Sequence, residues 1–171
     1  MAINTTAKLS VDTTYNQKDS SSSVSDSRTG SLGYSASLTS GTGSLQVDAV
    51  FNLDIEPITS GSELSLNLAS LSQPMLGATL NMSFNNVKSL AILNTSTTIG
   101  EDISVRATGS DAFTAPFNGG SGNLLVKPAA SYIYSDPYTG ATVDSSNKNF
   151  QITNEGTGTI SINVVAVGVT G

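Results

Sequence analysis

The sequence contains no cysteine, histidine or tryptophan, and each absence removes a class of chemistry. Without histidine and cysteine there can be no Ser-His-Asp triad, no thiolate nucleophile and no imidazole or thiolate metal site. Disulfides are excluded as well, so stability must come from packing or from assembly. These absences remove most hydrolases and nearly all zinc, copper and haem chemistry, and we predict no catalytic residue, no metal ligand and no cofactor.

Charge is also scarce, and its balance is acidic. Only 12% of the 171 residues are charged, and 13 acidic against 7 basic side chains give a net charge of -6. A nucleic-acid partner is not expected, because such proteins need a basic surface. The longest apolar stretch, residues 164–169, is far shorter than a membrane-spanning helix, so no membrane partner is expected. Residues 1–6 lack a signal-peptide pattern, which predicts that the chain is made and kept in a cytoplasm, or released by lysis.

Small polar residues take the place of charged ones, and they alternate with apolar residues in a pattern that indicates strands. Serine, threonine, asparagine and glycine account for 78 residues. Every odd position from Leu45 to Ile55 is apolar, and the stretch 160–166 alternates in the same way. Short alternating runs separated by Gly-centred turns predict an all-β, antiparallel β-sandwich of jelly-roll-like type. The sequence is also compatible with one turn of helix near residues 69–76.

The N-terminal region is predicted to be organised differently from the rest. We expect residues 1–31 to form an extended N-terminal arm or flexible segment, and residues 32–171 to form the β-sandwich domain. The stretch 16–31 has no periodic apolar face and includes four consecutive serines, so it is either a linker or an arm that orders on a neighbouring subunit. Leu9, Val11 and Tyr15 alternate and could supply a strand to a neighbour by β-augmentation.

Aromatic residues gather in one part of the chain. Half of the ten aromatic residues lie between 113 and 138, which indicates either a sugar or protein contact patch or ordinary core packing. These five residues are Phe113, Phe117, Tyr132, Tyr134 and Tyr138. Together with Leu9, Val11 and Tyr15 they make up the candidate interface. The carboxylate pairs Asp54/Glu56 and Glu101/Asp102 are interpreted as solvated charges rather than as a calcium or glycosidase site.

Residues 64–171 carry a series of strand and turn motifs that resembles a known group of proteins. The series includes "VKSLAILNTS" at 87–96, "GEDISV" at 100–105, "FTAPF" at 113–117 and "FQITNEG" at 150–156. It is similar to the small β-sandwich structural proteins of tailed bacteriophages and prophages, which are capsid decoration (cement) proteins, head fibres or other particle-surface proteins. Where that family has Gly-Gly after a proline, this chain has Pro128-Ala129-Ala130.

The resemblance implies a non-enzymatic virion structural protein, first of all a capsid decoration or cement protein that bridges and stabilises major capsid subunits. Its partners would be the major capsid protein or other virion subunits, and it would form a homo-oligomer, with a trimer favoured. Two alternatives remain open. One is a tail, baseplate or head-fibre protein that binds host-surface glycans, and the other is a free carbohydrate-binding module. The first 60 residues lie outside the resemblance and are candidates for a particle-specific anchor.

Overall fold

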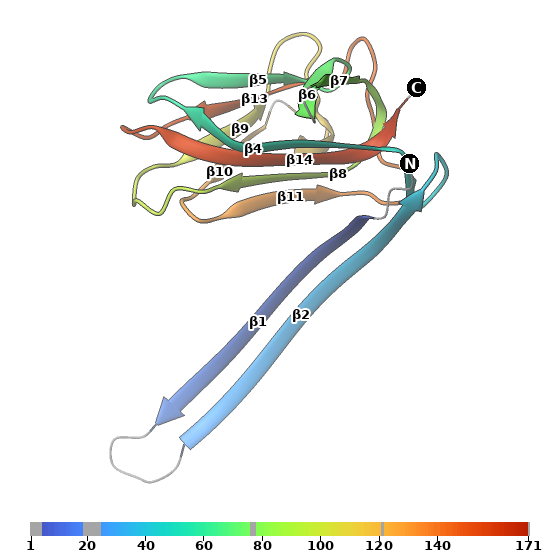
Figure 1. Ribbon diagram of the computed structural model, residues 1–171. Coiled ribbons are helices and arrows are strands. Elements are labelled where there is room, and N and C mark those ends of the chain that lie inside the picture. Colours follow the sequence, from blue (N-terminus) through green and yellow to red (C-terminus); the bar gives the residue numbers. More distant parts are fainter. Residues whose placement is uncertain (1–4, 19–24, 76–77, 121, 171) are drawn as a thin grey trace.

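The structure, a computed structural model, describes residues 5–18, 25–75, 78–120 and 122–170, with residues 5–36 described by their backbone path. In these ranges it consists of strands and one short 3-10 helix, η1 (Ala115–Phe117). The prediction of an all-β antiparallel sandwich with an extended N-terminal arm is confirmed (Figure 1).

Two sheets pack face to face to form the sandwich. The first has the strand order β11 (Ser131–Ser135), β8 (Phe84–Asn94), β14 (Ile160–Thr170) and β4 (Ala49–Ile58). The second has the order β10 (Asn123–Val126), β9 (Ile103–Ala107), β13 (Asn149–Asn154) and β5 (Glu63–Asn67). All these pairings are antiparallel, and the chain crosses between the two sheets several times, for example from β4 to β5, from β8 to β9, from β10 to β11 and from β13 to β14.

Alternating sequence accounts for the core. Along β14, Ile160, Ile162 and Val164 are buried between the sheets, while Ser161 and Asn163 lie on the opposite face. The other strands also alternate, and their inward-facing branched aliphatic and aromatic side chains fill the interior. Burying each such side chain contributes about 1.5–3 kcal/mol relative to leaving it exposed. The largest of the fully buried side chains are Phe84, Phe113 and Phe150.

Short elements complete the sandwich. β6 (Leu71–Met75) and β7 (Ala78–Met82) form a hairpin, and β12 (Ala141–Thr142) pairs with β8. The expectation of a helical turn near residues 69–76 is wrong for the described part of that range. Leu71 is buried in the core and lies opposite Met82 in the hairpin, so strand pairing outweighs any local helical preference.

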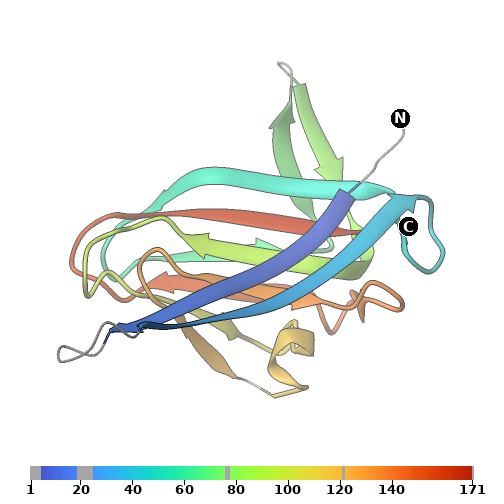
Figure 2. The same cartoon turned by 90° about the horizontal axis from the view of Figure 1, so that it is seen from below.

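The N-terminal arm is a long two-stranded ribbon. β1 (Thr5–Lys18) pairs with β2 (Ser25–Ser40) in a continuous antiparallel register, and the ribbon extends obliquely away from the sandwich (Figures 1 and 2). At about 3.4 Å per residue, the 14 residues of β1 span roughly 45 Å. The expected domain boundary between residues 31 and 32 falls inside β2. Residues 16–18 and 25–31 are strand rather than linker, and residues 19–24 lie outside the described ranges.

Candidate interaction site

The aromatic residues expected at an interface lie in different environments. Phe113 is fully buried and its backbone amide donates to the carbonyl of Asn149 at 2.7 Å, so in this conformation it is a core residue without a contact surface. Phe117, in η1, is half-buried and packs against the core. These two residues therefore follow the core-packing interpretation.

Tyr132 and Tyr134 lie on the inner face of β11. Both are half-buried against the core, and the Tyr132 hydroxyl donates to the carbonyl of Pro116 at 3.1 Å. Burial raises the pKa of Tyr132 above 10.0, and it raises that of Tyr134 with a further contribution from the negative charge of Asp136. The Tyr132 side chain therefore ties the loop that carries η1 to the first sheet.

Tyr138 is the exposed member of the group. Its side chain is 65% exposed, at the tip of the loop between β11 and β12. The buried ammonium group of Lys88 donates to its backbone carbonyl, and the backbone carbonyl of Pro137 accepts from the amide of Leu45. The loop is thus held from two sides, and it presents one aromatic side chain to the surroundings.

The carboxylate pairs do not form a metal site. Glu101 accepts from the backbone amide of Gly158 at 3.0 Å, and Asp102 forms an ion pair with Lys127 at 2.7 Å, so this pair fixes turns of the sandwich. Asp54 is exposed on β4, as expected for a solvated charge. Within the described ranges, no group of three or more acidic side chains is arranged to hold a metal ion. No helix among these residues has the length and apolar character needed to cross a membrane.

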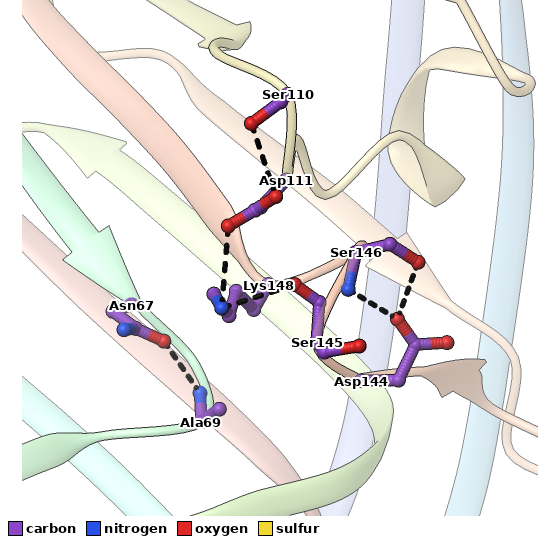
Figure 3. A network of polar contacts seen from close by, with 8 residues as sticks. All are labelled: Asn67, Ala69, Ser110, Asp111, Asp144, Ser145, Ser146 and Lys148. Atoms are coloured by element: carbon purple, nitrogen blue, oxygen red, sulfur yellow. Dashed lines mark hydrogen bonds and ion pairs between the residues drawn. The ribbon is translucent and has the colours of Figure 1, made fainter.

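A second polar cluster joins loops of the sandwich (Figure 3). The Lys148 ammonium lies 3.3 Å from Asp111 and also donates to the carbonyl of Ser145. Asp144 accepts from both the amide and the hydroxyl of Ser146, and the backbone hydrogen bond is the main cause of its lowered pKa. These contacts are satisfied within the loops, and they act as structural ties.

The register of the ribbon separates apolar from polar residues. Leu9 is opposite Tyr34 and Val11 is opposite Leu32, and in an antiparallel pair opposite residues lie on the same face. Tyr15, opposite Arg28, falls on this face as well. We define the apolar ribbon face as the three consecutive apolar pairs of this face: Ala7 with Ala36, Leu9 with Tyr34, and Val11 with Leu32.

The other ribbon face is polar along its whole described length. Its β1 positions are Thr6, Lys8, Ser10, Asp12, Thr14, Asn16 and Lys18, and their β2 partners are serine, threonine and glycine. The ribbon is therefore amphipathic over residues 7–11 and 32–36, whereas beyond them the face that carries Leu9 and Val11 also includes polar residues such as Thr13, Arg28 and Asp26. The signal for a hairpin was available as two alternating runs, 9–15 and 32–38, on either side of a Ser-rich stretch.

The ribbon is anchored to the outer face of the first sheet. Leu38, which shares the register of the apolar ribbon face, is buried against Val47 of β3 (Gln46–Val47) and Val167 of β14. The amide of Thr39 donates to the carbonyl of Leu45, and that of Gly41 donates to Val47, both at 3.0 Å. Because Val167 belongs to a central strand, the ribbon is joined directly to the body of the sandwich.

Next to this anchor, the outer face of the first sheet carries further apolar residues. Val165 of β14 is opposite Ala91 of β8, and Ala91 is opposite Ile133 of β11, so the three form one row across the sheet. Leu93 lies two residues further along β8. Ile133 is 40% exposed and Leu93 is 36% exposed. We call Ala91, Leu93, Ile133 and Val165 the outer apolar patch.

Comparisons with known proteins give no family. No protein-family model matches the chain, and no curated protein matches it. Two of the solved structures that resemble it are crystal structures of PirA and of the Yersinia pseudotuberculosis-derived mitogen. PirA is 12% identical with a TM-score of 0.36, covering 71% of this chain and 95% of its own. The mitogen is 16% identical with a TM-score of 0.33, covering 70% and 84%. Similarity at this level does not bear on function.

Proposed function

We propose that this chain is a non-enzymatic structural protein of a virus particle, a capsid decoration or cement protein that grips neighbouring subunits through its N-terminal ribbon. The observation that carries the proposal is the amphipathic ribbon of β1 and β2, which extends beyond the sandwich. An isolated two-stranded hairpin is marginally stable in water, so a ribbon with an apolar face gains stability by binding to another surface. The resemblance of residues 64–171 to phage surface proteins supports the choice of a virion as the assembly.

The mechanism is mechanical coupling rather than catalysis. Contacts made by the ribbon on a shell subunit pass to the sandwich through the anchor of Leu38, Val47 and Val167. Since Val167 is paired with strands on both sides, a force on the ribbon is shared across the first sheet. Many modest contacts of this kind, repeated by the symmetry of a shell, would hold adjacent capsid subunits against internal pressure from packaged DNA.

The proposal is tested by counting copies. Quantitative mass spectrometry of purified particles from the source should give a ratio of this chain to the major capsid protein near one, or near one third. A few copies per particle, or none, would contradict a decoration role. Particles that lack the protein should also lose resistance to heat and osmotic shock.

A pair of substitutions tests the ribbon specifically. Val11→Asp places a charge on the apolar ribbon face, whereas Thr14→Asp places the same charge on the polar face of the same strand. Val11→Asp should abolish rebinding to stripped particles, and Thr14→Asp should retain it. Equal binding of the two variants would show that the apolar face is not the attachment surface.

Glycan binding is the second candidate, and the exposure of Tyr138 favours it. An aromatic side chain that is 65% exposed on a held loop is suited to stacking on a sugar ring. This would fit a tail, baseplate or head-fibre protein or a free carbohydrate-binding module. A glycan array should then give a signal that Tyr138→Ala removes. If the unmodified protein gives no binding signal on the array, this candidate function is contradicted.

A further inference from the structure

The chain has two apolar surfaces that could pack against each other. One is the apolar ribbon face, and the other is the outer apolar patch on the sandwich. Each lies on a β-surface, and each is framed by small polar residues such as Ser131 and Ser135 on β11. Apolar residues aligned across neighbouring strands bring about association because they remove apolar area from water.

The anchor of the ribbon shows that these two kinds of surface fit together. Leu38 has the register of the apolar ribbon face, and it is 2% exposed where it packs on the outer face of the first sheet. Beyond its anchor, the ribbon of β1 and β2 extends obliquely away from the sandwich that carries β8, β11 and β14 (Figure 1). The same packing can therefore be repeated along the ribbon on the sheet of a second copy.

We propose that the apolar ribbon face of one copy packs on the outer apolar patch of a second copy, so that the chain assembles by arm exchange. Each copy donates one ribbon and offers one patch. Such a head-to-tail contact closes into a ring when the rotation between copies allows it. The inference concerns the free protein, and it goes beyond the proposed function because it requires no particle. Since the proposed function uses the same ribbon face, the contact between copies and the contact with a shell subunit exclude each other, and a ribbon bound to a shell has left the second copy.

The distribution of charge favours this arrangement over direct contact between sandwiches. Residues 1–31 contain three basic and three acidic side chains, so the net charge of -6 belongs to residues 32–171. Two acidic sandwiches repel each other, whereas a neutral ribbon meets an acidic sandwich without net repulsion. The polar ribbon face, with serine and threonine at most of its positions, can remain in water.

Because the chain has no cysteine, single-cysteine variants provide a direct test. Leu9→Cys and Ile133→Cys chains are co-expressed and oxidised, and the disulfide-linked products are identified by intact mass. A heterodimer is expected. Two control pairs are matched to it: Thr14→Cys with Ile133→Cys uses the polar ribbon face, and Leu9→Cys with Leu125→Cys uses an apolar residue, 53% exposed, on the second sheet. Heterodimer yields no higher than in the controls would overturn the proposal.

Two further measurements distinguish a failure of this proposal from a failure of the proposed function. In size-exclusion chromatography with light scattering, the unmodified chain should be oligomeric, Leu9→Asp and Ile133→Asp should be monomeric, and Leu125→Asp should match the unmodified chain. Circular dichroism of each variant shows that it is folded. A monomeric unmodified chain overturns the proposal, as does an intrachain disulfide in the Leu9→Cys/Ile133→Cys double variant, which would place the ribbon on its own sandwich. Neither outcome changes the particle count that tests the proposed function.

Discussion

The turn before β11 provides a sharp test of how local backbone geometry sets stability. The amide of Ala130 donates to the carbonyl of Lys127 at 3.0 Å, Pro128 occupies the second position, and Ala129 has φ of 58°. Proline followed by a residue with positive φ is the pattern of a type II turn, which favours glycine at the third position. Ala129 is exposed, so its methyl group contributes little packing to offset the unfavourable backbone conformation.

The expected gain from Ala129→Gly follows from two opposing terms. The left-handed conformation costs an L-residue roughly 1–2 kcal/mol, and glycine avoids this cost. Glycine also gives the unfolded chain more freedom, which reduces the gain by about 0.4–1 kcal/mol. The variant should therefore be more stable by about 0.5–1 kcal/mol. For a chain of 171 residues, that corresponds to a rise in melting temperature of about 1–3 °C.

A second turn offers the reverse substitution as a matched control. The amide of Ser62 donates to the carbonyl of Thr59 at 3.0 Å, and Gly61 has φ of 69° at the equivalent position. A Cβ on Gly61 would have no heavy atom within 4 Å, so Gly61→Ala changes the backbone preference without a clash. It should destabilise the protein by about the amount that Ala129→Gly stabilises it.

Urea unfolding followed by circular dichroism, at one fixed protein concentration, measures both changes. The midpoints should move in opposite directions while the slopes stay unchanged, because neither variant alters the surface exposed on unfolding. If Ala129→Gly lowers the midpoint, or if Gly61→Ala leaves it where it was, the reasoning from φ is refuted.

Three further changes have defined outcomes. Asn94→Ala should lower the free energy of unfolding in urea by about 2–3 kcal/mol, because the fully buried side-chain amide donates to the carbonyls of Glu101 and Val126, which would lose this donor. A decrease below about 0.5 kcal/mol would show that water replaces the amide. Ile55→Gly should stabilise the protein by about 1 kcal/mol in thermal unfolding, because Ile55 is 64% exposed with φ of 53°; a lower melting temperature would contradict this. Since burial raises the pKa of the tyrosines of β11 above 10.0, the folded state keeps their protons longer, so stability present below pH 10 should fall as the pH rises further. Urea titrations from pH 9 to 11 should show this decline, and a double Phe variant that declines as steeply would exclude these two groups as its cause.

The sequence determined the class of fold because period-two alternation is a local property. A stretch such as 160–166 must place its apolar residues on one face, whatever partner it meets. In the stretch 45–55 the alternation is broken by the structure, since Val47 is buried at the ribbon anchor and Phe51 in the main core. The same reasoning located most strands of the sandwich. It failed near Leu71, where pairing with the next strand in a hairpin decides the structure, and at Ile55, where a bulge opposite Asn163 interrupts the alternation and leaves an isoleucine exposed.

The candidate site was determined by the sequence only in part. Leu9, Val11 and Tyr15 could be selected because they alternate, but their membership in a ribbon face with Leu32 and Tyr34 depends on the register of a hairpin. Whether an aromatic residue is buried is likewise a tertiary property: Phe113 and Tyr138 come from one aromatic-rich stretch, yet one is in the core and the other at a loop tip.

The strand order and the outer apolar patch were decided by the tertiary structure. Ala91, Ile133 and Val165 belong to three different strands and lie far apart in the chain. They form a surface only because β8, β11 and β14 pair in one register. Alternation fixes the face on which a residue lies, because it acts within one strand, whereas the identity of the neighbouring residue depends on pairing between strands across long loops.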